Sequence, residues 1–394
     1  MRFEEIGAYY GNIQWEAVRV NALKNAERIR RFIWKRKKEL FTKEFYATVF
    51  RVINQHFNYF DRVSSEQFHE NLRIIEKRPW NIHLETTNIC NSNCVFCAYP
   101  LMKRQKKIMS SEIFNKVLDD YCKIGGGEIS FLGDAEPTTD PAFIARIKAA
   151  RKRPQIKDIT TITNGILFDK IGFENFLTSG INRVQISVGA FDKEIYTKLY
   201  RNKYYDRVRE NILNLLKTNS ELGCPVEIKI AFRTTLSMKQ TLNLVDYQEM
   251  KKYPHKVEFN TDFHSWGGKV KKENLPGGII FREPVPLREQ VPCFLLYDGP
   301  IIYPDGKFGL CHCQDIDADS ELVVGNIMNH SLLELWQSEK VKCIRERFYK
   351  KDYPALCRNC PTYINLDFYK TKKGKERADF IKTVYGDSSS LAAV

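Results

Sequence analysis

Cys90-Asn91-Ser92-Asn93-Cys94-Val95-Phe96-Cys97 is the most informative stretch of this chain. Its three cysteines are separated by three residues and then by two, directly after the strand-like residues 81–87. Thiolates crowded on one loop can converge on an iron–sulfur cluster, because soft sulfur ligands suit iron. Three ligands leave one iron of a four-iron cluster open to a substrate or cofactor. The alternatives are buried thiols or zinc, which usually has a fourth protein ligand nearby; the only histidine close by is His83.

Length and composition predict a multidomain protein of a reducing compartment. At 394 residues with 43% hydrophobic content, the chain suits two or three domains. The sequence contains no apolar run long enough to span a bilayer, and its first residues do not resemble a secretory signal. Eleven cysteines, an odd number, favour metal or redox chemistry over a disulfide framework. We therefore expect a cytoplasmic protein.

The net charge of +14 suits an anionic partner. Candidates are a phosphorylated or carboxylate substrate, an acidic redox protein, a membrane surface or nucleic acid. A solvated lysine-rich surface is the alternative. Residues 1–78 are expected to be mostly helical, and residues 26–40 place Ile29, Phe32, Ile33 and Leu40 on one helical face with basic residues on the others. Such a helix can contact a membrane peripherally or dock on a neighbouring domain.

Strand and helix patterns alternate between Trp80 and Pro276. Helices are expected at 110–123 and 141–151, with strands at 81–87, 128–132, 158–163, 183–188, 226–232 and 256–260. This alternation predicts parallel strands with helices outside, as in an α/β barrel or open sheet. Function in such folds lies at the carboxyl ends of the strands, where the cysteine loop falls.

Other polar residues follow the same strand ends. Gly133, Asp134 and Glu136 belong to a turn after the second strand, and Asn164 follows the third. Ser187 lies in the fourth strand, and Arg201 follows a later helical segment. Each of them also fits ordinary turn chemistry, but together they predict a site at one rim.

These residues resemble the radical S-adenosylmethionine (radical SAM) superfamily. The resemblance implies a partial (β/α)6-type TIM barrel and a [4Fe-4S] cluster on Cys90, Cys94 and Cys97. It also implies that S-adenosylmethionine contacts Phe96, Gly133, Asp134, Glu136, Asn164, Ser187 and Arg201. The acidic turn of Gly133, Asp134 and Glu136 would hold the methionine amino group. Asn164 and Ser187 would face the ribose and carboxylate, and Arg201 would pair with the carboxylate. Phe96 would pack on the adenine. Ala135 departs from the pattern, because a glycine is usual there.

The region beyond Pro276 holds six of the eleven cysteines. A structural zinc site of four thiolates is one interpretation. The spacing of Cys293, Gly306 and Cys311, with the final pair Cys357 and Cys360, also resembles the SPASM domain of radical SAM enzymes or its shorter twitch form. That resemblance implies one auxiliary [4Fe-4S] cluster on Cys293, Cys311, Cys357 and Cys360.

Cys313 competes with Cys311 for the ligand role and is the alternative donor of a hydrogen atom to a substrate radical. Cys122, Cys224 and Cys343 are expected to be buried thiols. The predicted organisation is a helical extension at 1–78, a core barrel at 79–275, a SPASM/twitch domain at 276–365 and a tail at 366–394.

The resemblance implies reductive cleavage of S-adenosylmethionine to a 5′-deoxyadenosyl radical, which abstracts hydrogen from a small polar substrate such as a sugar, an aminocyclitol or a nucleotide- or lipid-linked sugar. We therefore expect an oxidoreductase that uses the auxiliary cluster as electron acceptor and flavodoxin or ferredoxin as electron donor. The alternative is a peptide-modifying maturase that forms crosslinks or epimers. An alternative of another class is a metal-stapled nucleic-acid-binding protein, which the sequence disfavours because it lacks aromatic platforms and repeat modules.

Overall fold

A computed structural model describes residues 63–260, 262–277, 279–366, 374–376 and 378–379. The chain divides into two compact units, and the larger comprises His69–Leu366 and Glu376–Val394. The expected helix at 26–40 and most of the segments 1–78 and 366–394 lie outside the described residues. The bounds of the four predicted segments stay predictions.

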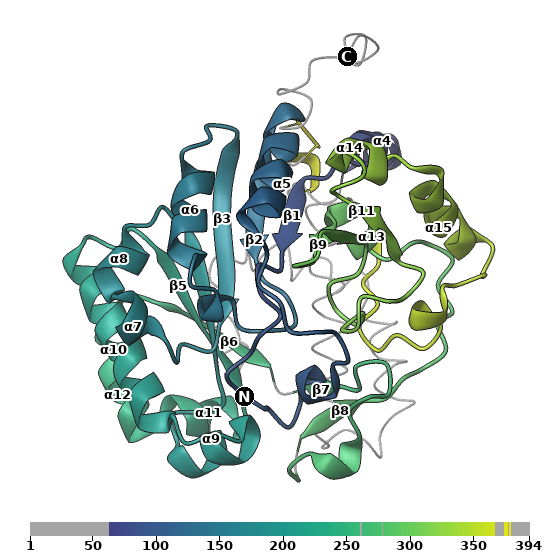
Figure 1. Ribbon diagram of the computed structural model, residues 1–394. Helices are drawn as coiled ribbons and strands as arrows, with labels where there is room; N and C mark the ends of the chain where they lie inside the picture. The colour runs from purple at the N-terminus through teal and green to yellow at the C-terminus, as the bar shows by residue number, and fades with distance from the viewer. Residues whose placement is uncertain (1–62, 261, 278, 367–373, 377, 380–394) are drawn as a thin grey trace. The chain divides into compact units, whose positions relative to one another are not determined.

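Six parallel strands form the centre of the larger unit, in the order β1-β2-β3-β4-β5-β6 (Figure 1). They are β1 Asn81–Leu84, β2 Gly127–Phe131, β3 Ile156–Thr163, β4 Arg183–Val188, β5 Glu227–Arg233 and β6 Lys256–Asn260. Every neighbouring pair is parallel, from Asn81 opposite Glu128 to Arg233 opposite Asn260. The expected α/β class with a partial six-stranded barrel is confirmed.

Helices connect successive strands on the outside of this sheet (Figure 1). They are α5 Ser111–Lys123, α6 Phe143–Arg151, α7 Phe168–Ile171, α8 Phe173–Leu177, α9 Lys193–Tyr200, α10 Tyr205–Glu221, α11 Met238–Leu242 and α12 Val245–Met250. Helix α5 shows why they form: Ser110 caps its first turn by accepting from the Ile113 amide, and apolar residues recur at helical spacing on its buried face.

The two faces of the sheet differ in polarity. Ile82, Ile129 and Ile159 are fully buried on one face. On the other face Asn81 donates to the Ser130 hydroxyl at 3.2 Å, and Thr160 donates to the same hydroxyl at 3.1 Å. Because side chains alternate along a strand, the apolar residues pack beneath the helices and the polar ones line the interior.

The carboxy-terminal region extends the sheet beyond β1. Strand β9 (Ile301–Ile302) pairs in parallel with β1, and β10 (Lys307–Gly309) and β11 (Val323–Asn326) continue it in antiparallel fashion. Helices α13 (Leu295–Asp298), α14 (Leu332–Trp336) and α15 (Glu339–Tyr349) accompany these strands.

The remaining described elements are short or peripheral. They are α4 Ser65–Lys77, the 3-10 turns η1 Tyr99–Leu101, η2 Pro137–Thr139, η3 Lys272–Asn274 and η4 Ala355–Cys357, and the two-stranded sheet of β7 Asp262–His264 and β8 Ile280–Arg282. Among the described residues, no helix combines the length and apolar character needed to cross a membrane.

Candidate active site

The cysteine loop is held in place by hydrogen bonds from several elements. The Cys90 amide donates to the Tyr99 hydroxyl at 2.8 Å, and the Val95 amide donates to the Leu199 carbonyl at the end of α9 at 2.9 Å. The Tyr99 amide donates to Cys97 Sγ at 3.4 Å. The loop therefore has a fixed backbone onto which ligands can converge.

The three thiols of this loop lie close together. Burial raises the pKa of Cys90 to about 12 and that of Cys97 to about 11. Burial, then Cys97 and Cys90, also raise the pKa of Cys94, so the three sulfur atoms lie near one another. Thiolates that converge in this way are suitable ligands for an iron–sulfur cluster.

Glu136 fastens the acidic turn to the next strand. Its carboxylate accepts from the Thr138 amide and hydroxyl at 3.1 and 2.6 Å, the Thr163 hydroxyl at 2.6 Å and the Asn164 amide at 2.7 Å. Burial raises the pKa of Glu136, and these donors oppose the shift. The structure therefore gives Glu136 a bracing role between β2 and β3 in addition to the predicted cofactor contact, which stays a prediction.

Asp134 lies beside a buried ion pair that the sequence did not reveal. Glu85 accepts from Arg104 Nη1 at 2.5 Å and Nη2 at 3.0 Å, and also from the Asp134 amide at 3.2 Å. A Cβ on Gly133 would lie 2.4 Å from Glu85 Cγ, so this close approach needs glycine. Burial, followed by the Glu85 charge, raises the pKa of Asp134 to about 8. A cationic ligand at this carboxylate would favour its ionised form.

Asn164, Phe96 and Ser187 occupy different walls of the same region. Asn164 donates from its side chain to Asn91 of the cysteine loop at 2.7 Å. Phe96 packs against Tyr200 and Phe263, with ring centroids 5.4 and 5.2 Å away. Ser187 lies in β4, opposite Ala231 of β5. The structure thus brings Asn164 into contact with the cysteine loop and packs Phe96 of that loop against Tyr200 and Phe263.

Arg201 is placed differently. It ends α9 in a left-handed conformation (φ 49°), is exposed, and lines a surface hollow with Lys193, Glu194, Thr197 and Lys198. Its predicted pairing with the cofactor carboxylate stays a prediction. Arg233 at the end of β5 is a cation nearer the loop, with its guanidinium carbon 5.5 Å from the centre of the Phe96 ring.

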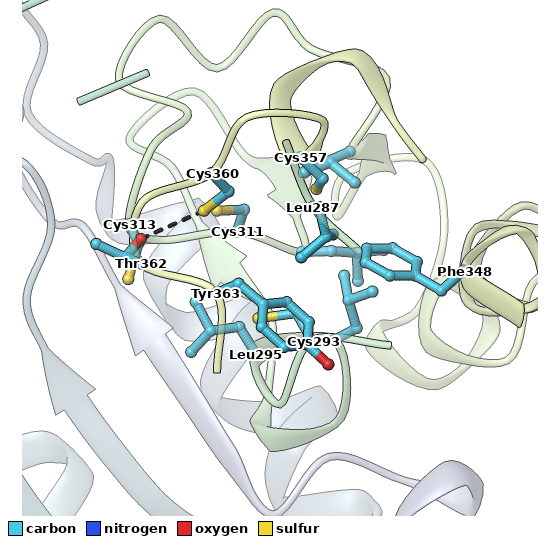
Figure 2. Close-up of a pocket in the computed structure, with 13 residues that line it drawn as sticks. Leu287, Cys293, Leu295, Cys311, Cys313, Phe348, Cys357, Cys360, Thr362 and Tyr363 are labelled. Carbon is cyan, nitrogen blue, oxygen red and sulfur yellow. Dashed lines mark hydrogen bonds between the residues drawn. The ribbon is translucent and has the colours of Figure 1, made fainter. Parts of the chain in front are cut away.

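A second set of cysteines lines one cavity in the carboxy-terminal region (Figure 2). Five thiols border it, from Cys293, Cys311, Cys313, Cys357 and Cys360, and apolar side chains such as Leu295 and Phe348 supply much of the remaining wall. Burial raises the pKa of Cys293 to about 11 and of Cys311 to about 12. Five thiols in one apolar cavity are sufficient for complete cysteine ligation of a four-iron cluster.

Cys311 and Cys313 differ in their surroundings. Burial, followed by Cys293 and Cys360, raises the pKa of both Cys311 and Cys313, so both thiols lie among the others of the cavity. Asp134 contributes to the raised pKa of Cys313 and is absent from the causes that raise the pKa of Cys311. The arrangement supports Cys311 as the ligand, which stays a prediction.

Sequence reasoning overlooked Glu85, Arg104, Arg233, His264 and Trp266 as site residues. One usable signal was present, because Glu85 is a charged residue at the end of an otherwise buried strand, next to the cysteine loop. His264 gave no signal of its own. Burial, with Arg233 and Arg282, lowers its pKa to about 4, so it is a neutral imidazole at physiological pH.

Two family models match the regions just described. Residues 84–244 match the radical SAM superfamily, and residues 293–361 match the SPASM iron–sulfur cluster-binding domain. The chain is a radical SAM protein with a SPASM domain. It therefore uses S-adenosylmethionine, a [4Fe-4S] cluster and an auxiliary iron–sulfur cluster.

Curated relatives of this radical SAM protein include GTP 3′,8-cyclases. The one from Clostridium acetobutylicum is 31% identical over 162 residues, which cover 39% of this chain and 49% of the relative. The one from Petrotoga mobilis is 27% identical over 169 residues, which cover 42% of this chain and 50% of the relative. The chain thus spans about half the length of the curated relatives it matches.

A solved structure shares the fold. Streptococcus suis SuiB, bound to precursor peptide SuiA, superposes with a TM-score of 0.53 at 17% sequence identity. The match covers 79% of this chain and 77% of SuiB. At this identity the comparison supports the fold alone.

Proposed function

We propose that this radical SAM enzyme oxidises a small polar substrate by removing a hydrogen atom from carbon, with the auxiliary cluster as electron acceptor. The observation that carries the proposal is the cavity with five cysteines. A cluster ligated by four of them has no iron left for substrate, so electron transfer is the role that remains. The enzyme would then be an oxidoreductase.

The chain's own residues would hold the cofactors in defined places. Cys90, Cys94 and Cys97 would bind the radical SAM cluster, and Cys293, Cys311, Cys357 and Cys360 the auxiliary one. When bound, S-adenosylmethionine and its cluster supply a 5′-deoxyadenosyl radical, and the auxiliary cluster supplies a one-electron acceptor. Asp134 would receive the ammonium group of the cofactor, because a cation beside this buried carboxyl would lower its raised pKa and favour the ionised form.

Charge near the cysteine loop favours a substrate with an anionic or oxygen-rich group. Arg233 lies over the ring of Phe96 in that loop, and its positive charge acts to lower the pKa of both Cys97 and His264. A guanidinium with five donors recognises carboxylate, phosphate or hydroxyl oxygens. The same basic character suits an acidic flavodoxin or ferredoxin as electron donor.

A second candidate function is nucleotide cyclisation. The observation that favours it is the similarity to GTP 3′,8-cyclases over about two-fifths of this chain. In that case GTP would be the substrate. We favour oxidation because the five cysteines around the cavity can ligate a cluster completely, as an electron acceptor requires.

The test is 5′-deoxyadenosine release by reconstituted protein under anaerobic reducing conditions. Separate reactions would contain GTP, a small-metabolite fraction of host extract or a peptide fraction. Stimulation by the metabolite fraction supports the oxidation. Stimulation by GTP supports the cyclase, and stimulation by peptides alone indicates a maturase. The Cys97→Ala variant is the control, and release from it would contradict the assignment of the radical SAM cluster.

A further inference from the structure

A chain of hydrogen bonds connects the cysteine cavity with the cysteine loop of the active site. Cys360 Sγ lies 3.4 Å from Thr362 Oγ1 (dashed line in Figure 2). Gln314 Nε2 donates to Thr362 Oγ1 at 3.1 Å and lies 3.5 Å from His264 Nδ1. We call Cys360, Thr362, Gln314 and His264 the Thr362 chain.

The active-site end of the Thr362 chain is fixed by Trp266. The Trp266 amide donates to His264 Nδ1 at 3.3 Å. The Trp266 indole donates to the carbonyl of Phe96, the residue before Cys97, at 2.9 Å. His264 Nδ1 therefore accepts from Trp266. The two hydrogens of Gln314 Nε2 are used by Thr362 Oγ1 and the Cys313 carbonyl. Gln314 meets His264 through a polar contact at 3.5 Å.

An iron-bound Cys360 would determine the direction of its bond with Thr362, in which either atom could otherwise donate. Thr362 Oγ1 accepts from the Gln314 amide, so the hydroxyl proton is available for donation. A cysteine that binds iron has lost its proton and can only accept. Gln314 is 1% exposed and its amide also donates to the Cys313 carbonyl at 2.7 Å, which fixes its orientation.

We propose that Thr362 stabilises the reduced auxiliary cluster by donating a hydrogen bond to Cys360, and that Gln314 orients the Thr362 hydroxyl for this purpose. Reduction adds an electron whose charge is shared by the sulfur ligands. A donor at one of these sulfurs favours the more negative state and raises the reduction potential. Thr362 is thus a positioning residue that makes the cluster a better electron acceptor. The inference rests on the proposed function only in needing a cluster bound to Cys360.

The experiment is a redox titration of the reconstituted protein followed by electron paramagnetic resonance. Thr362→Val keeps the shape but removes the donor, so we expect the midpoint potential of the auxiliary cluster to become more negative. Thr362→Ser keeps the hydroxyl and should restore the wild-type value. Gln314→Leu should shift the potential in the same direction by a smaller amount, and it carries the test if Thr362→Val does not load the cluster.

Two controls show whether a change in potential is specific to the auxiliary cluster. The radical SAM cluster of the same sample should keep its potential in all variants. Thr178→Val changes a hydroxyl that donates to the Glu174 carbonyl on an exposed helix, and should leave both potentials unchanged. Equal potentials in Thr362→Val and wild type, or in Thr362→Val and Thr362→Ser, would overturn the proposal. Wild-type protein without a second cluster would instead refute the acceptor role in the proposed function.

Discussion

At the scale of single residues, burial determines the charge state of the candidate site. Asp134 is buried beside Glu85, and both effects raise its pKa to about 8. In the unfolded chain the same carboxyl ionises near pH 3.8. Between these two values the folded state retains a proton that the unfolded state has lost, so the folded state loses stability as the pH rises.

This difference predicts the pH dependence of Asp134→Asn. Asparagine imitates the protonated carboxyl and does not titrate. The wild-type free energy of unfolding should therefore fall relative to the variant between about pH 4 and pH 8, by at most about 1.4 kcal/mol per pH unit. Urea unfolding of both proteins at pH 5, 6, 7 and 8 measures the effect. A difference that is constant over this range would contradict the raised pKa.

The two neighbouring cysteines of the cavity give a second prediction at this scale. Both line the cavity, but Asp134 of the candidate active site raises the pKa of Cys313 alone, which favours Cys311 as the ligand. We expect Cys311→Ala to abolish the auxiliary cluster and Cys313→Ala to retain it. Iron analysis and electron paramagnetic resonance of the reconstituted variants measure this. The reverse pattern would assign the ligand role to Cys313.

At the scale of elements, the contact between β9 and β1 joins the SPASM region to the barrel. Ile301 and Ile302 pair with His83 and Leu84. Gly299 precedes β9, and a Cβ at this position would lie 1.8 Å from the backbone oxygen of Asn81. Because a backbone oxygen within a sheet cannot swing aside as a side chain can, the pairing tolerates no side chain at residue 299.

Gly299→Ala should therefore separate β9 from β1. We expect a loss of at least about 3 kcal/mol of stability, at the upper end of the cost of overpacking. Gly277→Ala is the matched control, since a Cβ there would meet no atom within 4 Å. Urea unfolding measures both variants. Equal stability of the two would show that the sheet adjusts to the added methyl group.

At the scale of the whole molecule, the two sets of cysteines belong to separate parts of the larger unit. One set follows β1, and the other lines the cavity near α13 and η4. The two clusters should therefore assemble independently. The arrangement also explains why the Thr362 chain matters, because it crosses from the cavity to the Phe96 carbonyl.

Iron content tests this independence. Wild-type protein should hold about eight irons per chain after anaerobic reconstitution, as expected for two four-iron clusters. The Cys90→Ala/Cys94→Ala/Cys97→Ala variant should hold about four and release no 5′-deoxyadenosine. The Cys357→Ala/Cys360→Ala variant should also hold about four. Zinc in place of iron, or loss of both clusters in either variant, would contradict the model of two separate sites.

The sequence alone determined the α/β class, the six parallel strands and the cysteine loop after β1, because these follow from local periodicity and spacing. It placed strands 183–188 and 256–260 at their observed bounds. Only the tertiary structure decided that Arg104 pairs with Glu85, that Arg201 is exposed, and that Gln314 joins Thr362 to His264. These contacts link residues 19 to 50 positions apart in the chain, and packing rather than local pattern sets which side chains meet over such separations.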